Sequence, residues 1–149
     1  MEERIENAIA LFKSGYNCSQ AVVAAFADMY GFSQEQALRI SASFGGGIGR
    51  MRLTCGAACG LFMLAGLEKG TVRGDDREGK AANYALVQCL AKEFERRNGS
   101  LICAELLGLK KPECVSTPEV RTPQYYAKRP CVKMVEEAAR IWIDHLTAK

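Results

Sequence analysis

The segment from Cys55 to Lys69 constrains the fold more than any other part of the chain. Thr54 is a good helix cap, Gly70 is a helix breaker, and the residues between them are apolar on nearly every face of the helix that they predict. A helix without a polar face is stable in water only when other elements surround it. We therefore expect residues 55–69 to form a buried central helix.

Other segments supply helices that can surround this one. Apolar residues recur three and four positions apart in residues 2–13, 18–30, 34–40, 76–97 and 131–146. Residues 110–129 contain three prolines and are expected to be irregular. No run of alternating β-branched residues predicts a strand, and no internal repeat is visible. The sequence predicts an all-α, compact helical bundle in which residues 1–149 form one domain.

Charge and hydropathy narrow the class of protein. The formal net charge is +3, from 20 Lys and Arg against 17 Asp and Glu, and this excess is too small to indicate nucleic-acid binding. The first residues are acidic and periodic, unlike a signal peptide, and no apolar stretch is long enough to cross a bilayer. We expect a cytoplasmic protein with no nucleic-acid or membrane partner, and the sequence leaves its oligomeric state open.

The cysteines are the residues that point to chemistry. The chain contains seven of them and a single histidine, His145. An odd number does not fit a secreted disulfide framework, and in a reducing compartment cysteines remain thiols unless they bind metal, act catalytically or sense oxidation. The simplest alternative for each is a small buried side chain. No C-x-x-C pair occurs, and the lone His145 is expected at the surface.

Four cysteines fall in the opening turns of predicted helices: Cys18, Cys55, Cys103 and Cys131. Unpaired backbone N–H groups and the positive end of the helix dipole favour the thiolate at such positions. The thiolate is the form that attacks disulfides, binds metal and is oxidised first. This pattern favours a reactive role for the four, against the alternative that small residues simply tolerate helix starts.

The other three cysteines carry weaker signals. Cys59 lies one turn after Cys55, so the two share a helix face and could share a metal, but Cys59 fits the buried core equally well. Cys89 lies on the apolar stripe of its helix and is interpreted as packing. Cys114 lies in a charged loop, where both an exposed reactive thiol and a ligand role remain open.

A glycine-rich loop precedes the central helix. Residues 45–50 read Gly-Gly-Gly-Ile-Gly-Arg, which makes Gly46, Gly47 and Arg50 candidates for binding an anion or cofactor. Neither nucleotide-binding fingerprint is present, because the loop lacks the Walker Lys and follows no strand. The alternatives are a tight connection between helices, which is favoured, and a loop that lets a substrate or partner protein reach Cys55.

Two further patterns have structural interpretations. Gly56 and Gly60, spaced four apart, predict that another backbone approaches the central helix closely. Lys128 and Arg129 are interpreted as solvated charge. Neither pattern by itself indicates chemistry.

Four short motifs, taken in order, resemble the C-GCAxxG-C-C family, whose name describes its cysteine pattern and whose members are assigned a redox role. The motifs are Asn-Cys-Ser-Gln-Ala-Val at 17–22, Phe-Gly-Gly-Gly-Ile-Gly at 44–49, Cys-Gly-Ala-Ala-Cys-Gly at 55–60 and Cys-Ala-Glu-Leu-Leu-Gly at 103–108. The resemblance covers roughly residues 5–131 and implies functional roles for Cys18, Cys55 and Cys103. It also points to Cys131 as the last cysteine of the pattern, with Cys114 as the alternative. The central motif reads Cys-Gly-Ala where the family label has Gly-Cys-Ala.

Three functional hypotheses follow. The first is a thiol-disulfide oxidoreductase or electron-transfer protein with Cys55 as nucleophile and Cys18 or Cys103 as the resolving thiol, acting on a redox partner protein or a small thiol. The second is a zinc or iron–sulfur protein with Cys18, Cys55, Cys103 and Cys131 as ligands. The third is a helical binding module with inert cysteines. The redox hypothesis ranks first.

Overall fold

The apolar segment that was expected to be central begins one residue later than predicted and forms α4 (Gly56–Lys69). The computed structural model describes residues 1–110 and 115–148. Within them α4 is buried along most of its length and packs against α2 (Cys18–Ala24), α5 (Arg77–Asn98) and α8 (Cys131–Thr147). The prediction of an all-α bundle around a buried central helix is confirmed.

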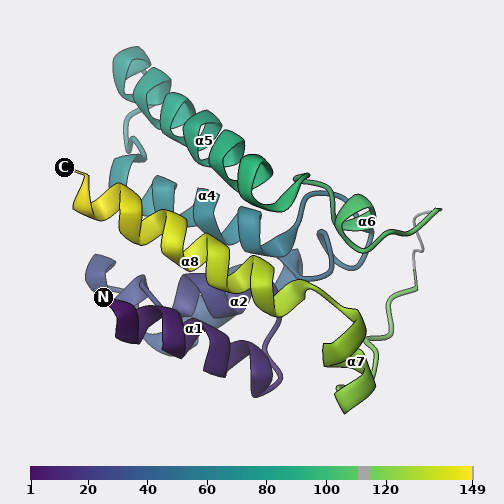
Figure 1. Ribbon diagram of the computed structural model, residues 1–149. Helices are drawn as coiled ribbons and strands as arrows, with labels where there is room; N and C mark the ends of the chain where they lie inside the picture. Colours follow the sequence, from purple (N-terminus) through teal and green to yellow (C-terminus); the bar gives the residue numbers. More distant parts are fainter. Residues whose placement is uncertain (111–114, 149) are drawn as a thin grey trace.

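The other helices complete the bundle (Figure 1). They are α1 (Glu2–Lys13), the 3₁₀ helix η1 (Ala27–Tyr30), α3 (Gln34–Ser41), the 3₁₀ helix η2 (Ala42–Phe44), α6 (Cys103–Leu106) and α7 (Pro123–Lys128). The described residues contain no strand; their only β-bridge joins Thr54 to Ile102. No helix among the described residues is long and apolar enough to cross a membrane.

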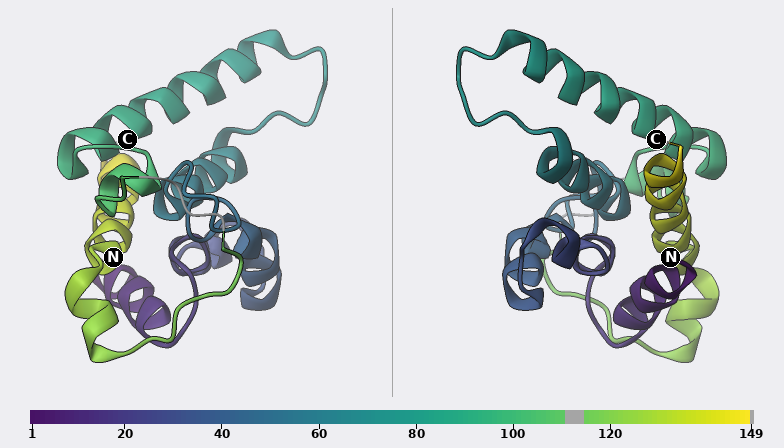
Figure 2. Two further views of the ribbon diagram at one scale, coloured as in Figure 1. Left: turned by 90° about the vertical axis from the view of Figure 1, so that its right-hand side faces the viewer. Right: turned by 90° about the vertical axis from the view of Figure 1, so that its left-hand side faces the viewer.

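The helices form layers on either side of α4 and α8. Helix α1 packs against α8 and α2, whereas α5 runs along α4 and α8 from the other side (Figure 1). The first half of α5 stands away from the bundle (Figure 2), and only Leu90 and Phe94 of this helix are buried. Helices α4 and α8 both begin at the end of the bundle where α6 and α7 lie (Figure 1).

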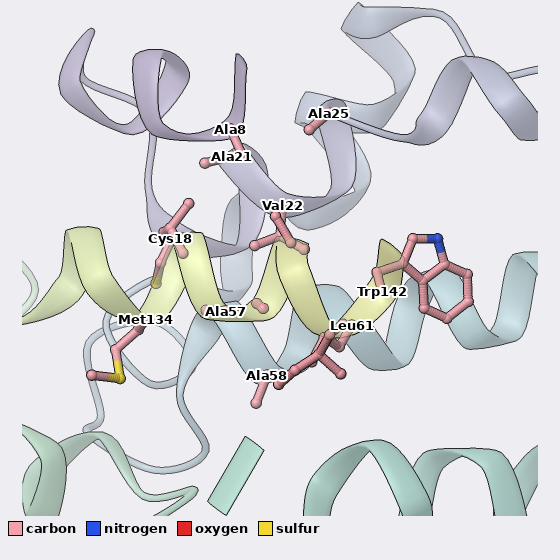
Figure 3. Close-up of a cluster of buried hydrophobic side chains, with 14 of the residues drawn as sticks. Ala8, Cys18, Ala21, Val22, Ala25, Ala57, Ala58, Leu61, Met134 and Trp142 are labelled. Carbon is pink, nitrogen blue, oxygen red and sulfur yellow. The ribbon is translucent and has the colours of Figure 1, made fainter. Parts of the chain in front are cut away.

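The core combines a few large side chains with many small ones. Trp142, Phe26, Phe94 and Leu61 are fully buried, and small residues such as Ala8, Ala21, Ala57 and Ala58 share the core with them (Figure 3). A Cβ atom on Gly60 would lie 2.9 Å from the Cβ of Val22 on α2. The close backbone approach predicted from the Gly56–Gly60 spacing is therefore present.

Several local expectations were wrong. The helix expected over residues 18–30 ends at Ala24, because the chain bends so that Val23 and Ala27 pack with Ala37 while their neighbours face the main core. Residues 110–129 are not irregular throughout, since the Thr122 hydroxyl accepts a hydrogen bond from the Tyr125 N–H and starts α7.

Two side chains lie elsewhere than predicted. Cys89 is exposed rather than packed, because α5 buries only the face that carries Leu90 and Phe94. His145 is half-buried rather than on the open surface, and its Nε2 lies 2.9 Å from a carboxylate oxygen of Glu68.

Candidate functional site

The four cysteines at predicted helix starts line one cavity of about 430 Å³. Cys18 opens α2, Cys55 is the N-cap of α4, Cys103 opens α6 and Cys131 opens α8. They are far apart in the sequence and meet because these helices begin at one end of the bundle. Figure 3 shows Cys18, Ala57 and Met134 near one another, with Trp142 toward the other end of the core.

The position of Cys18 is fixed by a capping box. The Asn17 side chain accepts a hydrogen bond from the Gln20 N–H (2.9 Å), and the Gln20 side chain accepts one from the Asn17 N–H (3.0 Å). Asn17 also donates to the carbonyl of Ala42 (2.9 Å), which joins the start of α2 to the segment before the glycine-rich loop. The Cys18 side chain is buried.

The surroundings of the Cys18 sulfur favour its negative charge. A hydrogen bond from the Cys55 thiol lowers the pKa of Cys18 most, and the backbone N–H groups of Gly46, Ser19 and Cys18 itself lower it further. Burial acts in the opposite direction. The balance lowers the pKa of the Cys18 thiol from 9.0 to about 6.

Cys55 is held by a short stretch of strand-like pairing. Its N–H donates to the carbonyl of Leu101 (2.7 Å), and the Cys103 N–H donates to the carbonyl of Leu53 (2.6 Å). Thr54 bridges to Ile102 between these bonds, so it does not act as the helix cap that the sequence suggested. The pairing therefore sets Cys55 opposite Leu101 and Cys103 opposite Leu53, and both cysteines line the cavity from this short stretch.

The Cys18 and Cys55 thiols differ in their affinity for a proton. Proximity to the Cys18 sulfur and burial hold the pKa of Cys55 well above 9.0, although the N–H groups of Ala58 and Ala57 act against this. The pair therefore shares one proton over a wide pH range, with Cys18 as thiolate and Cys55 as the thiol that donates to it.

Gly56 makes this contact possible. A Cβ atom at this position would lie 2.4 Å from the Cys18 sulfur and 2.8 Å from the carbonyl oxygen of Phe44. Any larger residue would displace the sulfur from Cys55 or push the chain before the loop away. The glycine after Cys55 is therefore a geometric requirement of the thiol pair.

The glycine-rich loop folds back on itself in a left-handed conformation. Ile48, Arg50 and Arg52 have φ values of 68°, 61° and 62°, which cost energy for residues with side chains. Backbone hydrogen bonds hold them: the Arg50 N–H donates to the Gly45 carbonyl and the Arg52 N–H to the Gly46 carbonyl, both at 3.1 Å. This conformation places both arginines at the cavity.

The loop residues singled out from the sequence have distinct positions. Gly46 directs its N–H at the Cys18 sulfur, and Arg50 lines the cavity. Gly47 lies against Cys103, where an added Cβ would be 2.6 Å from the cysteine Cβ. The anion that Gly46 faces in this structure is the thiolate of the chain itself.

Cys103 and Cys131 complete the cysteine lining. Arg52 donates from Nη1 to the Cys103 sulfur at 3.7 Å, but burial outweighs this contact and raises the pKa of Cys103. Burial, and then the charge on Cys18, raise the pKa of Cys131 to about 12. At neutral pH both are thiols.

Sequence reasoning missed three charged residues of the cavity. Arg121, Arg129 and Glu119 all line it, and Arg129 forms an ion pair with Glu119. The interpretation of Arg129 as solvated charge was therefore wrong. These residues belong to a segment without helical periodicity, so no spacing indicated which way their side chains point.

The remaining cysteines lie outside the cavity or outside the described residues. Cys59 is buried and its sulfur lies 3.8 Å from the Thr54 carbonyl; Cys89 is exposed; Cys114 lies outside the described residues. The six cysteines at described positions are all free thiols. Among residues 1–110 and 115–148, no three His, Cys, Asp or Glu side chains are grouped so that they could hold a metal ion.

Comparison with known proteins assigns the chain to a family. No curated protein and no solved structure matches it. One family model matches residues 16–145, a span that contains all four cysteines of the cavity and the glycine-rich loop. The chain therefore belongs to the C_GCAxxG_C_C family, which is described as "putative redox-active protein".

Proposed function

We propose that the protein carries out thiol–disulfide exchange, with Cys18 as the attacking thiolate and Cys55 as the resolving thiol. The observation that carries the proposal is the shared proton of this buried pair, which leaves a thiolate at neutral pH beside a second thiol. The description of the family as redox-active supports the same class of chemistry. The roles of the two cysteines are the reverse of those suggested by the sequence.

The reaction balances with a disulfide as the oxidant. The Cys18 thiolate attacks one sulfur of the disulfide, a mixed disulfide forms at Cys18, and the other half leaves as a thiolate that takes up a proton. Loss of the Cys18 charge removes a cause of the raised pKa of Cys55, so Cys55 can release its proton more easily. The Cys55 sulfur then attacks Cys18, forms the Cys18–Cys55 disulfide and releases the second thiol.

Other features of the cavity fit this reaction. Cys103 and Cys131 line the same cavity as thiols, so they are available to accept the disulfide from Cys18 and Cys55 in a later exchange. A reducing cytoplasm, which we propose as the setting, would keep all four in the thiol form between turnovers.

Mapping the disulfide after mild oxidation tests the proposal. Reduced protein is treated with hydroxyethyl disulfide, quenched in acid, alkylated and digested with trypsin. Cys55 and Cys59 fall in the same tryptic peptide, residues 53–69, so the map is made in a Cys59→Ser background. We expect one new bond, between Cys18 and Cys55.

Single substitutions separate the two roles. Cys18→Ser should abolish the reaction, and Cys55→Ser should accumulate a mixed disulfide at Cys18, visible as an added mass of one hydroxyethylthiol group. Cys89→Ser is the matched control, because this thiol is exposed and lies outside the cavity. Reaction at Cys89 with Cys18 and Cys55 unmodified would refute the proposal.

A further inference from the structure

The lining of the cavity also carries arginines whose chemistry the exchange reaction does not use. Arg121 and Arg129 flank α7, and both line the cavity with Cys18 and Cys55. Neither donates to the sulfur of a cysteine at a described position. Their contacts therefore show what else the cavity can bind.

Arg121 is held in place by neutral groups. It donates to the carbonyls of Phe12 (2.8 Å) and Tyr16 (3.0 Å), and its guanidinium lies 4.3 Å from the centre of the Phe12 ring and 5.0 Å from that of Tyr125. Carbonyls and rings orient a guanidinium group without cancelling its charge. The half-buried Arg121 thus presents a positioned positive charge at the cavity.

Among the described residues that line the cavity, Glu119 carries the only carboxylate, and two arginines lie near it. It forms an ion pair with Arg129 and lies 4.0 Å from Arg50. Glu119 offsets the charge of at most one of the two guanidinium groups that flank α7, because the described contacts of Arg121 are to carbonyls, a hydroxyl and aromatic rings. The α7 side of the cavity is therefore suited to an anion.

The size and lining of the cavity indicate an organic molecule. Apolar side chains form part of the wall, among them Phe12, Leu106 and Met134. A volume of about 430 Å³ lies in the range of sites for small organic ligands. The Cys18 and Cys55 side chains are only 8% and 6% exposed, so a small molecule can approach them more readily than a disulfide on the surface of a folded protein.

We propose that the disulfide attacked by Cys18 is a small organic molecule that carries carboxylates, which Arg121 and Arg129 bind while its aliphatic part packs against the apolar wall. Carboxylates are the groups that the planar guanidinium binds through two parallel hydrogen bonds. This inference rests on the proposed exchange function and names its substrate class. The molecule accepts two electrons and leaves as two carboxylate-bearing thiols, and the protein retains the Cys18–Cys55 disulfide.

A series of three small disulfides that differ in charge tests the proposal on the unmodified protein. The probes are 3,3′-dithiodipropionate (anionic), hydroxyethyl disulfide (neutral) and cystamine (cationic). Each rate constant for oxidation of the protein is divided by that of the same disulfide with 3-mercapto-1,2-propanediol, a neutral thiol that differs from all three leaving groups, which cancels the difference in leaving groups. We expect the normalised rate to fall from anion to neutral to cation by about tenfold or more overall at low salt, and the spread to shrink at 1 M salt.

Variants locate the effect. Arg129→Gln and Arg121→Gln should each reduce the ratio of the anionic to the neutral rate several-fold. Arg140→Gln is the matched control, since Arg140 pairs with Glu2 and Glu136 away from the cavity. Thermal unfolding checks that each variant is folded, and the series on the unmodified protein remains decisive if one is not.

The outcomes separate this inference from the function on which it rests. Equal normalised rates for the three disulfides, or a faster reaction with the disulfides of insulin, would overturn the substrate class and leave the exchange chemistry in place. If none of the disulfides reacts at Cys18, the exchange function itself fails. An anion preference that survives both arginine substitutions would overturn the assignment to these residues.

Discussion

The hydrogen bond from Cys55 to the Cys18 sulfur is the largest cause of the low pKa of Cys18, and Cys55→Ala removes it. With a pKa of about 6, Cys18 is about nine-tenths thiolate at pH 7, against about one-hundredth for a thiol at 9.0. A hydrogen bond to a charged group contributes about 1.5–3 kcal/mol, which corresponds to about one to two pH units. We therefore expect the pKa of Cys18 to rise to between about 7 and 8 in Cys55→Ala.

The rate of alkylation at Cys18 measures this change. Iodoacetamide reacts with the thiolate, so the rate at each pH follows the thiolate fraction, and peptide mass spectrometry assigns the modified residue. At pH 6 the rate at Cys18 should fall about 5- to 50-fold in Cys55→Ala. Cys55→Ser is the matched control, because its hydroxyl can still donate to the sulfur and should keep the midpoint near that of the unmodified protein.

Two results would refute this reasoning. If the midpoints of the unmodified protein and Cys55→Ala coincide, Cys55 does not stabilise the thiolate, and the backbone N–H groups alone account for the low pKa. If the unmodified protein itself titrates near 9, the thiolate assignment to Cys18 is wrong. Cys131, with a pKa of about 12, gives an internal contrast because it should remain unmodified below pH 9.

Three further predictions concern the helix contact and the electrostatics. Gly60→Ala places a Cβ 2.9 Å from a side-chain carbon of α2 and should lower the free energy of unfolding by about 1–3 kcal/mol, whereas Gly66→Ala meets open space and should raise it by up to about 1 kcal/mol; urea denaturation measures both. The reduced protein should exceed Cys18→Ser in free energy of unfolding by an amount that grows from pH 6 to pH 9, by at most about 1.4 kcal/mol per pH unit. In this window the folded Cys18 thiol has lost its proton, whereas the unfolded thiol retains it. A difference that does not change with pH would contradict the lowered pKa of Cys18. Arg52→Gln should raise the pKa of Cys103 further, which the pH dependence of its alkylation measures; an unchanged midpoint would show that the guanidinium does not act on this thiol.

The sequence predicted the bundle well because helical spacing and helix caps are local signals. The breaker at Gly70 and the apolar residues of the central segment each act within one or two turns, and the structure follows them. Placement of cysteines at helix starts is also a local signal. It selects Cys18, Cys55, Cys103 and Cys131, which are the four cysteines that line the cavity.

The arrangement of the site depends on contacts that no local pattern encodes. The pairing of residues 52–55 with 101–104 holds both Cys55 and Cys103 at the cavity, yet it consists of a single bridge and a few hydrogen bonds. Arg121 reaches the cavity through contacts to residues more than a hundred positions away. Which of the two thiols loses its proton also depends on tertiary contacts, since both Cys18 and Cys55 lie at helix starts.

The asymmetry between the two thiols has a physical origin in the glycine-rich loop. Helix-start N–H groups face the sulfurs of both Cys18 and Cys55, so the helices alone do not distinguish them. Cys18 has in addition the N–H of Gly46, which the left-handed conformation of the loop directs at its sulfur. Gly56 lets that sulfur approach Cys55 closely enough for one proton to serve both. The loop and the glycine after Cys55 therefore act on the same atom, which explains why motifs so far apart in the sequence form one site.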